Sequence, residues 1–134
     1  MADRIDGRAR ELIEAKNFCH VATNGKDGRP DTAVVWVSTD GQDVLLNGAE
    51  GRTWPANLRR DPRTKLTIVN LENPYEYVAI EGDAVEVTPE GADEHIDFLA
   101  KKYLDQDSYP FRAPGEVRLL VRVRPLKTSV WGGG

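Results

Sequence analysis

The sequence predicts a mainly β protein, an antiparallel barrel of six or seven strands with three short helices. Stretches rich in β-branched and aromatic residues recur along the chain, and turns containing glycine or proline separate them. Only three stretches place apolar residues at helical spacing. With 134 residues, 40% of them hydrophobic, the chain fits one domain spanning residues 1–134 with a core of its own.

The first part of the chain predicts a helix followed by three strands. Residues 3–16 place Ile5, Leu12 and Ile13 at helical spacing among charged residues, as in a surface helix. The three strand-like runs are Asn17–Thr23, Asp31–Ser38 and 44–47, with glycine-containing turns between them. Consecutive strands joined by such turns are expected to pair in order as an antiparallel meander.

The central stretch, residues 51–63 (GRTWPANLRRDPR), predicts a short helix between two strands. Pro55 suits the first turn of a helix because its missing N–H is not needed there, and Asp61-Pro62 ends the helix. The N–H groups at the start of such a helix would lie at the rim of the sheet, where an anion can bind. This arrangement is typical of a phosphate site.

The arginines of this stretch are expected to have different roles. Arg52 lies just before the helix and is the best candidate to bind a phosphate or carboxylate. Arg59 and Arg60 lie at the end of the helix, where cations offset the helix dipole. Asn57 is expected to cap the helix or pack it against the sheet.

The second half of the chain predicts two long strands around one helix. In the strand at residues 75–88, Gly82 indicates a bulge or a sharp bend. The helix opens at Pro89-Glu90, and its predicted apolar positions are Ile96, Phe98, Leu99 and Tyr103. An irregular loop at residues 105–116 leads to a final strand, 117–130, which Pro125 limits to an edge or a bend.

Composition excludes several classes of function. A net charge of −4 and an isoelectric point near 5.2 argue against a surface for nucleic acid or an anionic membrane, so any anion site is local. No apolar run approaches the ~20 residues that cross a bilayer, and the charged start of the chain is unlike a signal peptide. The single cysteine, Cys19, fits a reducing compartment. We therefore expect a cytoplasmic protein without a membrane or nucleic-acid partner.

The residues offer little chemistry of their own. His20 and His95 belong to no pair with metal-ligand spacing, so no metal site is predicted. Neither a GxSxG nucleophile motif nor a glycine-rich dinucleotide fingerprint occurs. We predict no catalytic side chain, and a bound cofactor would have to supply the reactive group.

Six motifs resemble, in their order along nearly the whole chain, a known superfamily. They are GRP at residues 28–30, VVWV at 34–37, NLRRDPR at 57–63, EGDAVEV at 81–87, KKY at 101–103 and RVRP at 122–125. The chain resembles the pyridoxamine 5'-phosphate oxidase-like split β-barrels, and among them the F420-dependent flavin/deazaflavin oxidoreductases of group B.

This resemblance implies a split barrel of the FMN-binding type that forms a homodimer, with two deazaflavin cofactors in grooves at the interface. It implies that the backbone of Val34, Val35 and Trp36 faces the cofactor ring, and that the loop from Asn47 to Trp54 holds the phosphate. The full predicted cofactor-binding set is Ala22, Thr23, Val34, Val35, Trp36, Asn47, Arg52, Thr53, Trp54 and Asn57.

One position departs from the family pattern. Relatives usually carry a phosphate-binding lysine where this chain has Trp54, whose indole offers a single N–H donor. Arg52, with the Thr53 hydroxyl and the N–H groups of the helix, is expected to take that role. Lys26 and Arg29 are further basic groups for an anionic cofactor tail.

The aromatic residues have two interpretations each. Trp36 is as well suited to the core as to contact with the cofactor ring. Tyr103 is expected to pack its helix against the rest of the protein, and closing the substrate pocket is the second interpretation. Tyr77 and Trp131 are expected at the dimer interface.

The resemblance implies a reductase that transfers a hydride from reduced coenzyme F420 to a small conjugated acceptor. Biliverdin-like tetrapyrroles, quinones and unsaturated lactones are the acceptor classes considered. An FMN-binding flavoprotein of the same superfamily is the enzymatic alternative. A carrier of a cofactor or ligand without turnover is the alternative from a different class.

Overall fold

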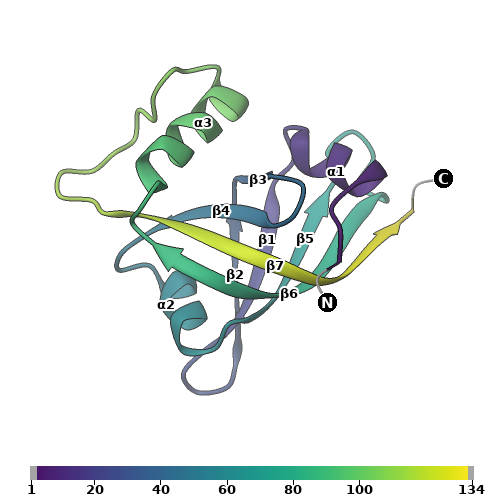
Figure 1. The fold of residues 1–134 in the computed structure, drawn as a ribbon, viewed down its shortest axis with the longest axis horizontal. Coiled ribbons are helices and arrows are strands. Elements are labelled where there is room, and N and C mark those ends of the chain that lie inside the picture. Colours follow the sequence, from purple (N-terminus) through teal and green to yellow (C-terminus); the bar gives the residue numbers. More distant parts are fainter. Residues whose placement is uncertain (1–2, 133–134) are drawn as a thin grey trace.

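The computed structural model describes residues 3–132, which form seven strands in one antiparallel sheet and three helices (Figure 1). The helices are α1 (Gly7–Glu14), α2 (Thr53–Arg60) and α3 (Ala92–Leu104). The strands are β1 (Cys19–Asn24), β2 (Pro30–Val35), β3 (Val37–Thr39), β4 (Val44–Ala49), β5 (Arg63–Val69), β6 (Tyr77–Thr88) and β7 (Arg118–Trp131). The predicted mainly β class is confirmed. Across residues 3–132, none of the helices combines the length and apolar character needed to span a bilayer.

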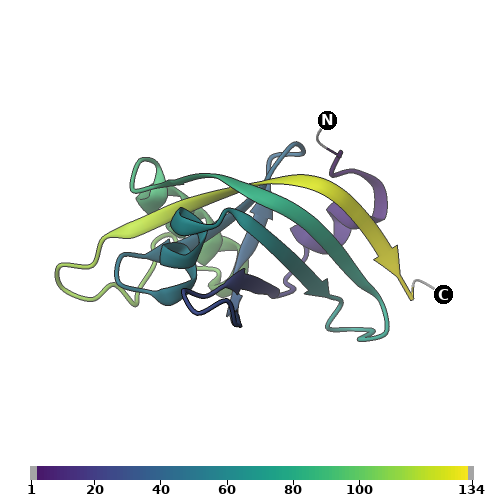
Figure 2. The same ribbon diagram turned by 90° about the horizontal axis from the view of Figure 1, so that it is seen from below.

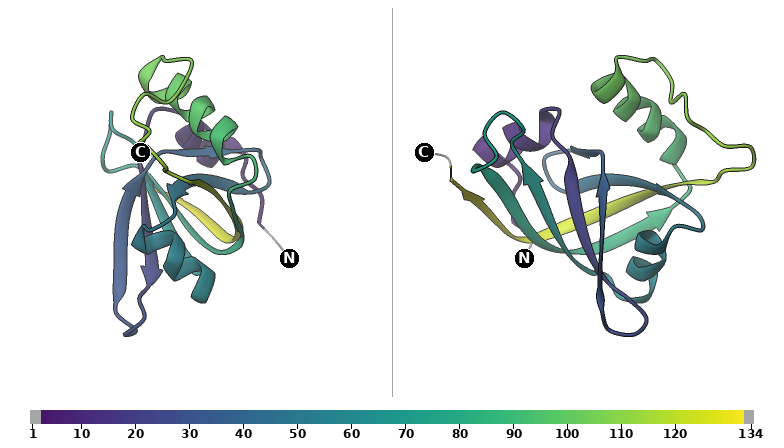
Figure 3. Two further views of the ribbon diagram at one scale, coloured as in Figure 1. Left: turned by 90° about the vertical axis from the view of Figure 1, so that its left-hand side faces the viewer. Right: turned by 180° about the vertical axis from the view of Figure 1, so that it is seen from behind.

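The sheet curls because one short connection joins its two edges. The strand order is β2-β1-β5-β6-β7-β4-β3, so β2 and β3 lie at opposite edges although only Trp36 separates them in sequence. Turned views show the sheet bent around itself into a half-barrel (Figures 2 and 3). The predicted unbroken strand Asp31–Ser38 is therefore wrong: it divides at Trp36, where the chain crosses from one edge to the other.

The predicted meander is correct only in part. β1 pairs with β2, and β3 pairs with β4, both in antiparallel register. The strand partner of β4 on its other side is β7, however, and β2 has only β1 as a partner among the described strands. The turn signals identified the hairpins, whereas the pairing between hairpins depends on residues far apart in sequence.

The two longest strands, β6 and β7, bend together at a bulge. Glu81 pairs with Lys127 and Gly82 pairs with Pro125, which leaves Leu126 as an extra residue in β7. A Cβ atom on Gly82 would lie 2.5 Å from the carbonyl oxygen of Arg124, so glycine is required at this approach. The predicted bulge is confirmed. The prediction that Pro125 marks an edge or a bend is also confirmed: among the described strands, pairing of β7 with β4 ends at Val123, so Pro125 pairs with β6 alone, and the bulge bends the strand there.

The core lies inside the curled sheet, and α1 and α2 lie at its two ends (Figure 1). Alternate residues of β7 point inward, and Leu119, Val121 and Val123 are fully buried. From α2, Trp54 reaches the core and lies against β4: a Cβ atom on Gly48 would be 2.8 Å from the Cζ2 atom of Trp54. Gly48 thus lets the helix approach the sheet closely.

Helix α3 lies outside the barrel, beside β4 and the start of β7 (Figure 1). Ile96 and Leu99 are buried as predicted, but Phe98 is 60% exposed because it lies on the solvent side of the helix. The Nζ atom of Lys102 donates hydrogen bonds to the carbonyl oxygens of Ile13 and Val37, at 2.7 and 2.6 Å. These bonds join the end of α3 to the connection where the sheet edges meet. The loop that follows α3 is irregular, as predicted.

Candidate functional site

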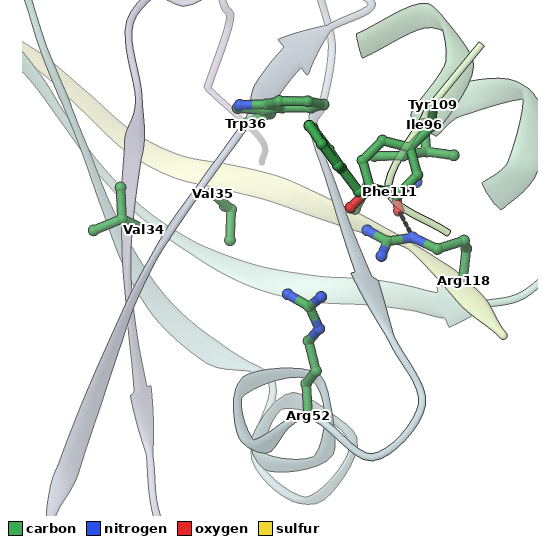
Figure 4. Close-up of a pocket in the computed structure, with 9 residues that line it drawn as sticks. Val34, Val35, Trp36, Arg52, Ile96, Tyr109, Phe111 and Arg118 are labelled. Atoms are coloured by element: carbon green, nitrogen blue, oxygen red, sulfur yellow. Dashed lines mark hydrogen bonds between the residues drawn. The ribbon is translucent and has the colours of Figure 1, made fainter. Parts of the chain in front are cut away.

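A cavity of about 160 Å³ opens beside the connection between β2 and β3, and we call it the Trp36 cavity (Figure 4). Strands, the start of α2, helix α3 and the loop after α3 all contribute to its wall. The lining residues are Val34, Val35, Trp36, Asn47, Arg52, Ile96, Tyr109, Phe111 and Arg118. Figure 4 shows the side chain of Val35 directed toward Arg52 and that of Val34 directed away from it.

Two tyrosines hold the indole of Trp36 in place. The Tyr103 ring stacks on it with centroids 5.0 Å apart and planes 8° apart, and the Tyr109 ring approaches edge-on at 6.0 Å. The Tyr103 hydroxyl donates to the carbonyl oxygen of Asn17 at 2.5 Å and accepts from the N–H of Val37 at 3.2 Å. Burial raises the pKa of Tyr103 to about 12, so this hydroxyl stays protonated and keeps both bonds. Trp36 therefore packs on α3 and lines the cavity at the same time.

A buried arginine lies on the opposite wall. Arg118 is 5% exposed, and its Nε atom donates to the Oδ1 atom of Asn47 at 2.9 Å. Its Nη1 atom donates to the Oε1 atom of Glu116 at 2.9 Å. The Tyr109 ring lies 5.1 Å from the Arg118 Cζ atom, a cation–π contact that also fixes the plane of the guanidinium.

The network behind this arginine stays neutral. The Asn47 Nδ2 atom donates to the carbonyl oxygen of Ala92 at 3.0 Å and to the Nδ1 atom of His95 at 3.1 Å. His95 must then carry its proton on Nε2, which lies 2.9 Å from the Ser38 hydroxyl oxygen. Burial, followed by the charges of Arg122, Arg118 and Lys102, lowers the pKa of His95 to about 4.

A second hollow, of about 670 Å³, begins at Arg52, and we call it the basic groove. It runs along the turn between β1 and β2 and the first turns of α2. Four of its lining residues are basic (Lys26, Arg29, Arg52 and Arg60) and two are acidic (Asp27 and Asp31). The Thr53 side chain, at the start of α2, lines the same groove.

Arg52 belongs to both hollows. It occupies the N-cap position of α2, and its side chain is 52% exposed. Figure 4 shows the guanidinium extending from the start of α2 toward the Trp36 cavity. Its Nη2 atom lies 3.9 Å from the Oε1 atom of Glu116, the carboxylate oxygen that also accepts from Arg118. Arg52 is thus a cation at the junction of the two hollows.

Asn57 fixes the wall of the basic groove. Its Nδ2 atom donates to the Thr23 hydroxyl oxygen at 3.0 Å and to the Oδ2 atom of Asp31 at 3.1 Å. Its Oδ1 atom accepts from Arg60 at 2.8 Å, and Arg60 also donates to the carbonyl oxygen of Asn24. These bonds join α2 to the hairpin of β1 and β2.

Most of the residues predicted for cofactor binding lie along these two hollows. Val34, Val35, Trp36, Asn47 and Arg52 line the Trp36 cavity, and Arg52, Thr53 and Asn57 line the basic groove together with Lys26 and Arg29.

Three predicted residues lie elsewhere. Trp54 is 5% exposed and packs in the core, where its side chain lines neither hollow. Ala22 and Thr23 line a third hollow on the outer face of the sheet, which also includes Arg63 and Leu126. Thr23 reaches the basic groove only through its bond from Asn57.

Sequence reasoning missed Tyr109, Phe111 and Arg118. Leu119 faces the core, so alternation in the last strand predicts that Arg118 faces solvent. In the structure α3 and the loop after it cover the Arg118 side of the strand. A usable signal was present in the loop, where Tyr109 and Phe111 flank a proline without an apolar period of their own. Large aromatic residues in an irregular loop need a partner surface.

Between Asp3 and Gly132, His, Cys, Asp and Glu side chains do not gather in groups of three or more with the spacing of a metal site. Cys19 is a free, buried cysteine, and burial raises the pKa of its thiol well above the usual range.

Solved structures share this fold at low sequence identity. A protein named F420 reductase matches with a TM-score of 0.81 and 23% identity over 92% of this chain and 98% of its own. A conserved hypothetical protein from Mycobacterium tuberculosis matches with a TM-score of 0.69 and 22% identity over 98% of this chain and 88% of its own. HupZ from group A Streptococcus matches with a TM-score of 0.67 and 16% identity over 93% of this chain and 92% of its own.

A family model extends this likeness to the sequence. The model of the pyridoxamine 5'-phosphate oxidase family matches residues 5–132, which include every element of the half-barrel and both hollows. The curled sheet of seven antiparallel strands is the split barrel that the sequence motifs indicated. The chain therefore belongs to the pyridoxamine 5'-phosphate oxidase family.

Proposed function

We propose that this protein is an oxidoreductase that binds coenzyme F420 along its two joined hollows and reduces a small conjugated acceptor. The observation that carries the proposal is the position of Arg52, which lines both the Trp36 cavity and the basic groove. A cofactor with a flat ring at one end and an anionic chain at the other needs these two environments side by side. Family membership and the similarity to a protein named F420 reductase support a flavin- or deazaflavin-type activity.

The donors of the basic groove match an anionic chain. Four basic side chains against two acidic ones leave the groove with an excess of positive charge, although the whole chain has a net charge of −4. Arg52 and the first N–H groups of α2 are suited to a phosphate, because charge-assisted bonds and the helix dipole act together there. Lys26 and Arg29 lie farther along the same groove, where they would meet carboxylates of a longer tail.

The length of this basic surface favours F420 over FMN. FMN ends in one phosphate, which a single compact cluster of donors can bind. In this protein the cations continue past Arg52 to the turn between β1 and β2. An extended row of cations is better matched to a cofactor whose negative charges continue beyond the phosphate.

The chain's own residues would position the ring and its partner. When bound and reduced, F420 supplies a hydride from C5 of its ring, so no catalytic side chain is required. The backbone of Val34 and Val35 would face the ring, and Trp36, held by Tyr103 and Tyr109, would close one end of the cavity. Rigid walls of this kind hold two reactants in a fixed geometry and exclude water.

A second copy of the chain would complete the site. Tyr77 pairs with Trp131 on the outer face of the sheet. Ala79, two residues after Tyr77, lies on the same face, and the strand pairing places Val34 in the same row as Ala79 across β5 and β1. Val34 is 61% exposed and Trp131 is 55% exposed, so this face leaves apolar surface in water. We propose that it is the homodimer interface, and Ala22, on the same face, would then lie beside the partner subunit.

Turnover of reduced F420 tests the function. Purified protein is mixed with reduced F420 and a quinone, and the absorbance of the oxidised deazaflavin is followed under single-turnover conditions. Oxidation that depends on both protein and quinone supports the reductase. Tight F420 binding without oxidation of the cofactor by any quinone, tetrapyrrole or unsaturated lactone would instead indicate a carrier, and turnover with FMN alone would indicate a flavoprotein.

A separate measurement tests the dimer. Sedimentation equilibrium is expected to give twice the mass of one chain for the unmodified protein. The Val34→Glu variant places a charge on the outer face and is expected to be monomeric. A monomeric unmodified protein at the concentrations used for turnover would contradict the interface.

A further inference from the structure

The Trp36 cavity has a buried cation on its wall whose donors are only partly used. A guanidinium has five N–H groups, and those of Arg118 that have a protein acceptor are one on Nε and one on Nη1. Among residues 3–132 the second Nη1 hydrogen and both Nη2 hydrogens have no hydrogen-bond acceptor. Arg118 is nevertheless 5% exposed, and Figure 4 shows its guanidinium projecting from β7 into the cavity.

Arg118 cannot satisfy these donors with the neighbouring side chains. The Oδ1 atom of Asn47 already accepts from Nε, and the Nδ2 atom of Asn47 is committed to Ala92 and His95. The aromatic rings and aliphatic side chains of the wall offer no strong acceptor. The free donors face the open space of the cavity, where the acceptor oxygens of a ligand can bind them.

The positive charge of the cavity wall also favours a ligand with acceptor oxygens. Arg52 and Arg118 both line it, and of the residues that the structure describes none of the lining side chains is acidic. Glu116 lies behind them and shares one carboxylate oxygen between the two guanidinium groups, at 3.9 and 2.9 Å. Two positive charges against one negative charge leave the wall positive, and a negative group would complete it.

We infer that the acceptor reduced by this protein carries a carboxylate and that Arg118 is the residue that recognises it. A guanidinium presents its donors in a plane that matches both oxygens of a carboxylate. The apolar side chains of Val35, Ile96 and Phe111 would contact the conjugated body of the same molecule. This inference rests on the proposed function for the reaction, but the binding of a carboxylate can be measured without turnover.

Cinnamate and cinnamamide are suitable probes because they have the same conjugated body and differ in the charge of one group. Isothermal titration calorimetry of the unmodified protein is expected to give an affinity for cinnamate about tenfold or more above that for cinnamamide. Arg118→Met is expected to abolish this preference. Equal affinities for the two probes in the unmodified protein would overturn the inference.

A matched control lies on the same strand. Arg122 follows Arg118 by four residues in β7, but its ion pairs are with Asp40, Asp43 and Glu86, outside the Trp36 cavity. Arg122→Met is expected to keep the preference for cinnamate. Loss of the preference in this variant as well would attribute it to the overall charge of the protein and overturn the role of Arg118.

A second variant is expected to raise the affinity for cinnamate rather than lower it. Glu116→Gln keeps an oxygen that accepts from Arg118 but removes the negative charge behind the cavity, so cinnamate is expected to bind more tightly. No gain in cinnamate affinity would overturn the binding of a carboxylate at this wall of the cavity. If thermal melting shows that Arg118→Met does not fold, Arg118→Lys keeps the charge without the planar pair of donors and is expected to weaken cinnamate binding.

Saturation with F420 identifies the source of the anion. If the acceptor carries it, the preference for cinnamate persists when F420 is bound. If F420 displaces cinnamate, and Arg118→Met also weakens F420, then the anion belongs to the cofactor and the acceptor assignment is overturned. A protein that prefers cinnamate but binds no F420 would contradict the proposed cofactor and leave Arg118 as a carboxylate-binding residue.

Discussion

The indole of Trp36 lies parallel to the phenol ring of Tyr103, with ring centroids 5.0 Å apart and ring planes 8° apart. Trp36 is the single residue between β2 and β3, which form opposite edges of the sheet. Tyr103 comes from the last turn of α3, sixty-six residues after Val37, whose N–H it accepts. One stacked pair thus connects the line where the barrel edges meet, helix α3 and the wall of the proposed site.

The hydroxyl of Tyr103 is expected to contribute to stability through two backbone groups. Tyr103→Phe keeps the stacked ring but leaves the carbonyl of Asn17 and the N–H of Val37 without this partner. Urea unfolding is expected to show a loss of about 1–3 kcal/mol. Tyr75→Phe is the matched control, since Tyr75 is 84% exposed, and it should change the unfolding free energy by less than ~0.5 kcal/mol. Equal stability of Tyr103→Phe and the unmodified protein would contradict the bonding described.

His95 is expected to make stability depend on pH. Its pKa is lowered to about 4 in the folded state by burial and by nearby cations, against 6.5 as its ordinary value. Between these values the unfolded chain binds more protons than the folded one, so stability is complete above pH 6.5 and falls as the pH drops toward 4. The shift corresponds to about 3 kcal/mol.

Denaturant unfolding at a series of pH values measures this effect. His95→Gln removes the titrating ring, and the stability of this variant should depend less on pH between 4 and 6.5. His20→Gln leaves His95 in place and should retain the dependence of the unmodified protein. An unchanged slope in His95→Gln would show that other groups cause the pH dependence.

The bulge that bends β6 and β7 requires glycine at position 82. In Gly82→Ala the added methyl group would lie 2.5 Å from the Arg124 carbonyl oxygen and 3.0 Å from a methyl group of Val123. The backbone of β7 must shift to relieve this contact, and the expected loss is about 1–3 kcal/mol in thermal or denaturant unfolding. Glu81→Ala, at the exposed neighbouring position, is expected to cost less than ~0.5 kcal/mol. A stable Gly82→Ala variant would show that the strands can separate here without cost.

Trp54 and Arg52 are expected to respond in opposite ways to substitution. Trp54→Phe removes part of a core side chain and should lower stability by about 1–3 kcal/mol, while F420 affinity stays within about twofold. Arg52→Ala should leave stability nearly unchanged, because its side chain is half exposed, and should weaken F420 binding. A loss of F420 affinity in the folded Trp54→Phe protein would mean that the indole contacts the cofactor.

Local patterns predicted the elements of this fold but not how they close. Helical spacing, turn glycines and Gly82 identified the helices, the hairpins and the bulge, because each depends on residues near one another in sequence. The break at Trp36 was missed because Val34-Val35-Trp36-Val37 contains only strand-forming residues. The chain breaks there because the two sheet edges must meet, which is a property of the whole sheet.

The sequence predicted the part of the candidate site that depends on residues close together in the chain. It did not predict the part whose burial depends on other elements of the fold. Arg52 and Thr53 were predicted because a helix start after a glycine turn has a recognisable pattern, and both lie along the basic groove with Asn57. Their contact with a cofactor stays a prediction. Trp54 was included on the family pattern alone, whereas its indole packs in the core against Gly48, and its part in cofactor binding stays a prediction. Arg118 was missed because its burial depends on packing against α3 and the loop that precedes β7, which alternation within the strand does not reveal.

Arg52 lies at the junction of the Trp36 cavity and the basic groove, which we propose hold F420 together. The most direct measurement titrates F420 and FMN separately into the unmodified protein, Arg52→Ala and Arg59→Ala, following intrinsic tryptophan fluorescence. Arg59 is the control, because it lies on the same helix but pairs with Glu50 outside the groove.

We expect F420 to bind more tightly than FMN, and Arg52→Ala to cost about 1.5–3 kcal/mol of F420 affinity, the range for a charge-assisted hydrogen bond. Arg59→Ala should bind F420 like the unmodified protein. Tighter binding of FMN than of F420, or an F420 affinity that Arg52→Ala leaves unchanged, would show that the two hollows do not hold F420 around Arg52.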